Sequence, residues 1–328
     1  MALDPTPYLV GGGAEHSAEV VRQALYDSTG GAEGVSGITD FKVQATATPG
    51  TQVRVSAGGG LLRNRYAGGQ GQSYSVRNIS ETLQGITATG SGGSRTDLIV
   101  ARVLDPQYEG QPPADPKTFQ YTRLAVISGV SSTIRSAREL NLPYPAIALA
   151  RVTLPPSTAT VQNSHITDLR QLARPRRETV IRAQSFLDVP GWEVILNNIS
   201  NDGQAFPGWA TQTTEIPDWA THVQIRADWL SVMYPPGTGY GQNWVEFGPF
   251  LRENTHTYST TRFTWDASSN ADPYRTNWTA ADEVAVPASI RGTVQPFILK
   301  GRVLGGGGLA RSTNRSGYLL ELNFIEKI

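Results

Sequence analysis

Seven tryptophans lie in the second half of the chain, in settings that are typical of a sugar-holding surface. All fall between Trp192 and Trp278, and none lies in the first 191 residues. An aromatic ring can cover the apolar C–H side of a pyranose, while amide, carboxylate or guanidinium groups bind its hydroxyls. We therefore predict a glycan-binding cluster in the loops of this half. Its members are Trp209, Tyr240, Trp244, Tyr274, Asn277 and Trp278.

The same rings have a second explanation, in which they cap the ends of a β-sandwich or pack at a subunit interface. A strand alternates its side chains between two faces, so Trp229 shares the apolar face of Val223 and Ile225 and is predicted to be core. Trp192 follows the same pattern with Val194. For the aromatic residues in loops, the sequence is compatible with both explanations.

Hydrolysis of glycans would need two carboxylates about 5 to 10 Å apart. The second half offers seven candidates, but any globular domain offers as many, and their separations do not follow from the sequence. We therefore predict no catalytic residue and keep a glycan depolymerase as a weaker alternative. The seven carboxylates are Asp228, Glu246, Glu253, Asp266, Asp272, Asp282 and Glu283.

Metal and phosphate chemistry have little to build on in this sequence. There is no cysteine, and no pair of the four histidines, His16, His165, His222 and His256, has the spacing of a zinc site. The glycine-rich segments 58–60 and 237–239 lack the lysine and hydroxyl of a P-loop, so we predict turns there. We expect no metal and no cofactor.

Composition excludes further classes of function. The 28 basic and 28 acidic side chains give a formal net charge of +0, which disfavours nucleic acid as a partner. The N-terminus lacks the pattern of a signal peptide, and no apolar run is long enough to span a membrane, so we expect a soluble, uncleaved product. A chain of 328 residues, with 34 glycines and 21 prolines, predicts two mainly β domains.

The elements that must position these residues follow from periodicity. One helix is predicted over 17–26, capped by Ser17 and ended by Gly30, and the rest of the first domain reads as antiparallel strands. Pro49 and Gly50 separate the first two strands and predict a hairpin. The expected strands are 41–45, 52–56, 73–77, 97–104, 119–128 and 146–154.

A charged, proline-broken segment divides the chain. We predict a first domain at 1–173, a linker at 174–180 and a second domain at 181–328. Six to eight strands in the second domain are typical of a jelly-roll-like β-sandwich. The expected strands are 192–196, 221–233, 244–251, 262–265, 289–304 and 318–325.

Several segments resemble the minor tail, baseplate or tail-tip proteins of long-tailed bacteriophages that infect actinobacteria. The resemblance covers residues 8 to about 172, whereas the second domain is only loosely similar to the jelly-roll modules of such proteins, at 221–225, 286–293 and 319–324. The matching segments of the first domain are 8–19, 40–59, 95–108, 147–152 and 166–170.

This resemblance implies a virion structural protein, made in the host cytoplasm, whose first domain attaches it to other tail or baseplate proteins. It implies a homo-oligomer, a trimer or a multiple of three, that presents a variable second domain. From the aromatic cluster we expect this second domain to bind a host cell-envelope glycan without catalysis. Under an alternative, the second domain is a scaffold that docks a separate receptor-binding protein. That reading expects Trp209, Tyr240, Trp244 and Trp278 to be buried between chains.

Overall fold

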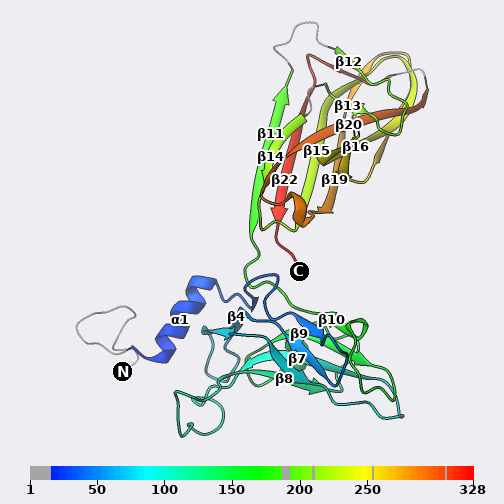
Figure 1. The fold of residues 1–328 in the computed structure, drawn as a ribbon. Helices are drawn as coiled ribbons and strands as arrows, with labels where there is room; N and C mark the ends of the chain where they lie inside the picture. The colour runs from blue at the N-terminus through cyan, green and yellow to red at the C-terminus, as the bar shows by residue number, and fades with distance from the viewer. Residues whose placement is uncertain (1–15, 187–192, 209–210, 253–254, 307–308) are drawn as a thin grey trace. The chain divides into compact units, whose positions relative to one another are not determined.

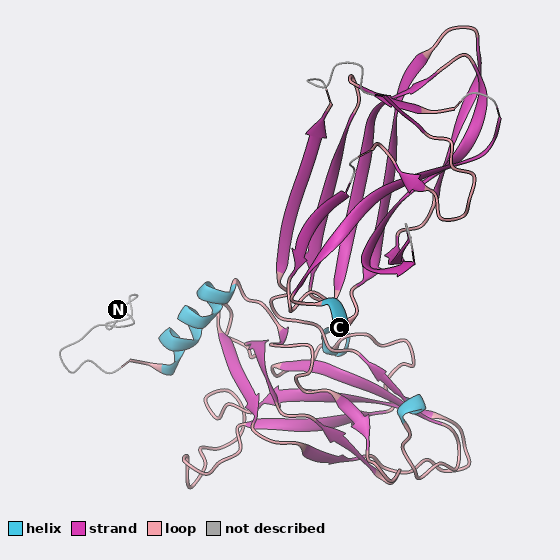
Figure 2. Cartoon of the chain, turned by 45° about the horizontal axis from the view of Figure 1, so that its top comes forward, coloured by secondary structure: helices cyan, strands magenta, loops and turns pink. Residues whose placement is uncertain are grey.

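The computed structural model describes residues 16–186, 193–208, 211–252, 255–306 and 309–328 (Figure 1). The chain is mainly β and divides into two compact units, Met1–Arg174 with Ile328, and Pro175–Lys327. Figure 2 shows strands throughout both units. The division falls one residue beyond the end predicted for the first domain.

The single α-helix of the described residues, α1 (Ala18–Thr29), belongs to the first unit. The side chain of Ser17 caps it by accepting a hydrogen bond from Val20 N, and Gly30 ends it with φ +62°. The helix was predicted over 17–26 and runs three residues further. None of its residues is buried. Arg22 instead bonds it to the unit, with its guanidinium donating to Gln72 at 2.6 Å and lying 3.2 Å from the Asp105 carboxylate.

The first unit contains three antiparallel sheets. The largest has the order β10-β9-β7-β8, and its central strand β7 is buried on both faces because Ile99 and Ala101 face one core and Leu98 and Val100 another. The strands of this unit are β1 (Gly34–Val35), β2 (Val43–Ala45), β3 (Gln52–Val55), β4 (Gly58–Arg63), β5 (Ser73–Asn78), β6 (Thr82–Gly85), β7 (Arg95–Val103), β8 (Thr122–Ser128), β9 (Ala146–Leu154) and β10 (Ile166–Asp168), with 3-10 turns η1 (Ala137–Leu140) and η2 (Asn163–His165).

The predicted hairpin is present, since β2 pairs with β3 in the register Val43↔Val55. The turn predicted at 58–60 is wrong, because these glycines begin β4. Gly58 has φ +156°, and a Cβ there would lie 2.4 Å from Cβ of Asp40. The glycine therefore reflects close packing of the backbone on Asp40, which can occur within a strand as well as in a turn.

The second unit is an eight-stranded jelly roll with short additional strands. Numbered along the chain, its main strands form one sheet in the order 1-8-3-6 (β11-β22-β15-β19) and a second in the order 2-7-4-5 (β14-β20-β16-β18). Apart from strands 4 and 5, which are neighbours in one sheet, sequential strands lie in opposite sheets, and this is the strand order of a jelly roll. The main strands are β11 (Arg177–Ser185), β14 (Thr211–Ile216), β15 (His222–Tyr234), β16 (Gly237–Arg252), β18 (Phe263–Asn270), β19 (Tyr274–Ala285), β20 (Thr293–Gly306) and β22 (Gly317–Ile325).

The remaining strands extend the edges of the two sheets. β13 (Gln204–Ala205) pairs with β20, as β14 does, and β17 (Thr255–Ser259) pairs with β16, as β18 does. β12 (Glu193–Ile195) and β21 (Arg311–Thr313) pair beside β15, and a 3-10 turn, η3 (Ala288–Ile290), precedes β20. The turn predicted at 237–239 is wrong, because these residues begin β16.

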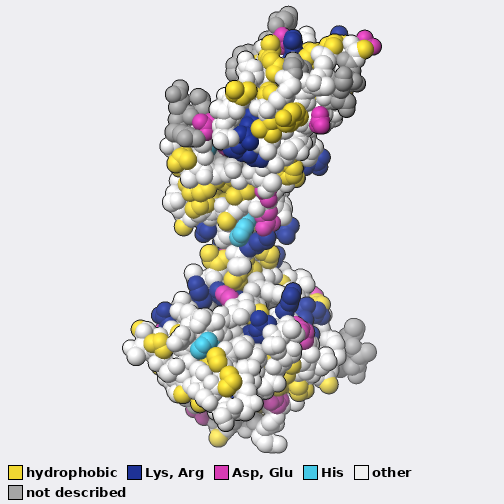
Figure 3. All heavy atoms as spheres, turned by 90° about the vertical axis from the view of Figure 1, so that its right-hand side faces the viewer, with side chains coloured by type: hydrophobic (Ala, Val, Ile, Leu, Met, Phe, Trp, Pro, Cys, Tyr) yellow, Lys and Arg dark blue, Asp and Glu magenta, His cyan; other side chains and the backbone are white. Residues whose placement is uncertain are grey.

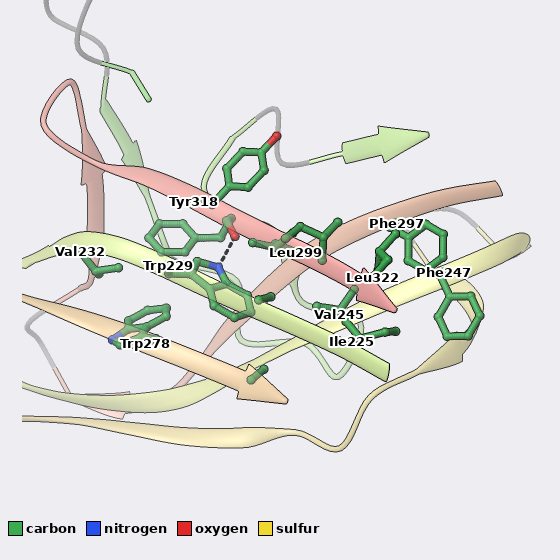
Figure 4. Close-up of a cluster of buried hydrophobic side chains, with 14 of the residues drawn as sticks. Ile225, Trp229, Val232, Val245, Phe247, Trp278, Phe297, Leu299, Tyr318 and Leu322 are labelled. Atoms are coloured by element: carbon green, nitrogen blue, oxygen red, sulfur yellow. Dashed lines mark hydrogen bonds between the residues drawn. The ribbon is translucent and has the colours of Figure 1, made fainter. Parts of the chain in front are cut away.

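The core of the jelly roll is aromatic (Figure 4). Trp229 is fully buried, as predicted, and its Nε1 donates to Phe206 O at 2.5 Å. Phe247 stacks on Phe297 with ring centroids 5.1 Å apart, so the two residues join β16 to β20. Of the five tryptophans that the structure describes, four are at most 5% exposed and therefore have a structural role: Trp229, Trp244, Trp265 and Trp278.

The predicted linker at 174–180 needs a correction, because Arg177 already begins β11. β11 pairs with β22 over its whole length, from Arg177↔Ile325 to Ser185↔Gly317. The preceding Arg176 is held by Glu326, to whose carboxylate it donates from Nε at 3.0 Å and from Nη2 at 2.8 Å. The charges in this segment thus attach the first strand to the last.

We expect Glu326→Gln to weaken the second unit and to flatten its loss of stability in acid. The hydrogen bond from Arg176 lowers the pKa of Glu326 from 4.5. The pair therefore stabilises the fold above about pH 4.5 and loses this effect as the pH falls through the folded-state pKa. With Arg176 55% exposed, the substitution should cost about 1 to 2 kcal/mol at pH 7. Urea unfolding at pH 7 and pH 3.5 measures both effects, and equal losses at the two pH values would contradict the prediction.

Candidate functional site

Two predicted members of the glycan cluster are buried, which corrects the prediction that they lie on open loops. Trp278 is 5% exposed within β19, and its Nε1 donates to the hydroxyl of Tyr234 at 2.7 Å. Trp244 is 0% exposed within β16. Both side chains are covered by their own chain, so neither an open sugar platform nor burial between chains describes them.

The other three predicted residues that the structure describes each have a different environment. Tyr274 is half-buried and packs on Tyr234, with ring centroids 5.1 Å apart. Asn277 is exposed, but its side-chain oxygen accepts a hydrogen bond from Ser231 N at 2.8 Å, so it braces a β-bulge in β15. Trp209 lies outside the described residues. Tyr240 alone remains a well-exposed aromatic ring among the predicted residues that the structure describes.

Tyr240 lies on the face of β16 that is directed away from the core. It is 51% exposed, and it pairs with Gly305 of β20 on one side and Asp266 of β18 on the other. A Cβ at Gly305 would lie 2.8 Å from the Tyr240 ring. Because no side chain fills this position, the ring can lie against the backbone of β20 and present its outer side to solvent.

Polar side chains continue the same face along the sheet. Gln242 lies two residues after Tyr240, and its side-chain oxygen accepts a hydrogen bond from Arg302 Nε at 2.9 Å. The Arg302 guanidinium also donates to the side-chain oxygen of Asn201. Thr264 of β18 pairs with Gln242 and is exposed, as is Asp266. We call Tyr240, Gln242, Thr264, Asp266 and Arg302 the β16 face.

The next residues on the same face of β16, Trp244 and Glu246, are buried and support the β16 face. Trp244 donates from Nε1 to the Glu246 carboxylate at 2.8 Å, and the guanidinium of Arg262 lies 4.3 Å from the Trp244 ring centroid. Lys300, 2% exposed, lies 3.6 Å from the same carboxylate. Trp244 thus positions Arg262 and orients Glu246, which is a supporting role in place of the predicted contact with ligand.

Burial lowers the pKa values of two cations in or near the β16 face, Lys300 and Arg302. Burial lowers the pKa of Lys300, against the opposing effect of Glu246. Burial, and then the neighbouring Arg262 guanidinium, lower the pKa of Arg302. An arginine keeps its charge at neutral pH even so. The β16 face therefore combines an open ring, an amide, a carboxylate and a fixed positive charge, the groups that bind a saccharide.

Sequence reasoning predicted Tyr240 as a sugar contact and named Asp266 only as a possible catalytic carboxylate, and it missed Gln242, Thr264 and Arg302. A signal was available, because Tyr240, Gln242, Trp244 and Glu246 alternate with Gly241, Asn243 and Val245. Each set mixes polar and apolar residues, which hides this alternation. It becomes visible only when the pairing of β16 with β18 and β20 is known.

Three carboxylates of this unit, Glu246, Asp282 and Glu283, are engaged in contacts within the fold. Glu246 also accepts a hydrogen bond from His256 N at 3.1 Å. Burial opposes ionisation of Asp282, but hydrogen bonds from Thr261 and Glu283 outweigh it, and the pKa of Asp282 is lowered. Hydrogen bonds from Lys327 and Gln224 lower the pKa of Glu283. A general acid of a glycosidase needs the opposite shift.

The described residues contain neither a candidate metal site nor a membrane-spanning helix. No group of three or more histidine, aspartate or glutamate side chains there could hold a metal ion. Within the same residues, no helix has the length and apolar character needed to cross a membrane.

Comparisons with known proteins identify no family. No family model matches the sequence, and no curated protein matches it. The similar solved structures include the VP2 subviral particle of infectious bursal disease virus, with 10% identity, a TM-score of 0.23, and coverage of 93% of this chain and 78% of that chain. The Gx strain of the same virus gives 12% identity, a TM-score of 0.22, and coverage of 90% and 73%. Matches at this level carry no functional information for this chain.

Proposed function

We propose that this chain is a structural protein of a virion, attached through its first unit and presenting the jelly roll for binding. The resemblance of residues 8 to about 172 to phage tail-tip and baseplate proteins supports the attachment role. The two-unit organisation, with the division at Arg174 and Pro175, fits a chain whose halves have separate tasks. In this proposal the protein is a homo-oligomer, a trimer or a multiple of three, that contacts other tail proteins.

The ligand of the jelly roll in this proposal is a glycan of the host cell envelope. The observation that carries it is the exposed Tyr240 ring, which lies against Gly305 and beside Gln242, Asp266 and Arg302. An amphipathic ring with polar groups at its edge offers both kinds of contact that a pyranose makes. Among the predicted cluster members that the structure describes, the proposal rests on Tyr240, with partners from β18 and β20.

No catalytic step belongs to this proposal. The buried carboxylate beneath the β16 face, Glu246, is occupied by Trp244, His256 and Lys300. The two lowered pKa values, of Asp282 and Glu283, favour ionised carboxylates over a proton donor. We therefore expect binding without cleavage of the glycan.

Incubating the purified full chain with actinobacterial cell envelopes tests the proposal. Retained protein and released soluble saccharide are measured in the same sample. We expect retention that free saccharides of the envelope compete away, and no saccharide above the level of a protein-free control. Saccharide release would instead establish the depolymerase. Absence of both retention and release would contradict adhesion.

One observation favours the scaffold alternative. Phe250 and Leu251, near the end of β16, are 72% and 66% exposed, and Val294 of β20 is 64% exposed. Exposed apolar side chains of this size are candidates for a protein contact. If the scaffold hypothesis is right, the double variant Phe250→Ser, Leu251→Ser no longer assembles with tail proteins. In that case neither the wild type nor any variant is retained by cell envelopes.

A further inference from the structure

A groove of about 470 Å³ lies on the first unit and contains none of the residues of the β16 face. Its lining includes Arg135, Arg151 and Arg170, with the hydroxyl side chains of Ser132, Thr133 and Thr167. In the space-filling view of Figure 3, Lys and Arg side chains occupy several places on the first unit.

The centre of the groove lies where β9 pairs with β10. Arg151 of β9 stands opposite Thr167 of β10 in the antiparallel register, so the two side chains are neighbours on one face of the sheet. The segment before η1 forms one wall, and the Arg151 guanidinium is fixed to it because Nη1 donates to Ile134 O at 3.0 Å. Arg151 is thereby held in place before any ligand arrives.

Only one of the three arginines is neutralised within the groove. Arg170 lies 2.7 Å from the Asp168 carboxylate and donates from Nη1 to the backbone carbonyls of Ile38 and Asp40, so its hydrogen-bonding capacity is used in the fold. Among the described residues, Arg151 Nε is buried without a hydrogen-bond partner. No ion pair of the Arg135 guanidinium occurs within the same residues, and Arg135 is exposed.

A guanidinium presents its donors as a fork that matches an oxyanion, and neither Arg151 nor Arg135 forms an ion pair within the described residues. We propose that this groove is an oxyanion-binding site in which Arg151 and Arg135 hold a phosphate or carboxylate group. The hydroxyls of Thr133 and Thr167 supply further donors at its edge. The volume of the groove leaves room for the larger molecule, or the protein side chain, that carries the anion.

Binding to the full chain can be measured by isothermal titration and by the shift in thermal midpoint, at constant ionic strength. The probes are inorganic phosphate and sodium acetate, with chloride as the reference salt. Phosphate binding stronger than acetate binding identifies a phosphoryl ligand, and the reverse order identifies a carboxylate. We expect Arg151→Gln and Arg135→Gln each to weaken binding of the preferred anion at least tenfold.

Arg77→Gln is the matched control, because it removes one exposed guanidinium from the same unit at a residue outside the groove. Arg135→Gln keeps the test valid if Arg151→Gln misfolds, because the Arg135 side chain forms no hydrogen bond with the residues that the structure describes. The proposal is overturned if neither anion binds more strongly than chloride. It is equally overturned if Arg77→Gln weakens binding as much as the two groove variants.

Discussion

Trp229→Ala should cost the jelly roll about 3 to 5 kcal/mol, the range of large-to-small aromatic substitutions in a core. Trp229 is 0% exposed, and its ring lies 6.4 Å from that of Trp278. The substitution leaves a cavity and also removes the donor to Phe206 O, which leaves a buried carbonyl without its partner. For a unit of this size the loss corresponds to a thermal midpoint lowered by about 10 °C or more.

Urea unfolding followed by far-ultraviolet circular dichroism measures this loss. Trp229→Phe is the matched variant, because it keeps a buried aromatic ring while it removes the indole N–H and the volume of the five-membered ring; it should cost about 1 to 3 kcal/mol. Tyr240→Ala serves as a surface control and should change stability by less than about 0.5 kcal/mol. If Trp229→Ala unfolds at the same urea concentration as the wild type, the aromatic core described above is incorrect.

The outline of the fold was predictable because its signals are local. Ser17 and Gly30 mark the helix, and the apolar alternation around Val223 marks β15. β7 could be predicted as a strand that needs partners on both faces, since Leu98 to Ala101 are all apolar. These are patterns within one element, and they require no knowledge of what lies opposite.

The missed strands carry weaker patterns. β19 places Trp278 and Ala280 inward, but its neighbours Tyr274, Thr276 and Asp282 are polar or only half-buried, so no apolar run appears. The sequence therefore reads as a loop, and Trp278 was assigned to the surface. β11 was missed for a related reason, because it is an edge strand with mostly exposed side chains and the charges at its start resemble a linker.

The candidate site was predictable only in part, because it depends on pairing between distant strands. Tyr240, Asp266 and Gly305 come together through the pairing of β16 with β18 and β20. Loop aromatics were a reasonable guide to Tyr240, yet Trp244, four residues away on the same strand face, is fully covered. The difference lies in the segment before β13, since a Cβ at Gly203 would lie 2.4 Å from the Trp244 ring. No local pattern encodes that contact.

Tyr240→Ala should reduce envelope retention by about tenfold for each independent site, which is about 1.4 kcal/mol of binding free energy. In the proposed oligomer the effect is larger, because linked sites raise avidity by roughly 10² to 10⁴ and each weakened site lowers that gain. Retention of the assembled protein should then fall by about 10²-fold or more. Comparing the variant with the wild type on the same envelopes at several protein concentrations measures this.

Three further variants distinguish the loss of a direct contact between Tyr240 and the sugar from a general disturbance of the fold. Tyr240→Phe keeps the ring and should retain most of the binding. Gly305→Val adds a side chain where the Tyr240 ring lies and should lose binding as the alanine variant does, because the ring must leave the surface of β20. Tyr121→Ala removes an exposed tyrosine of the first unit and should leave retention unchanged. Retention of Tyr240→Ala at the wild-type level would exclude the β16 face as the binding surface, since its other members are polar groups that water already satisfies.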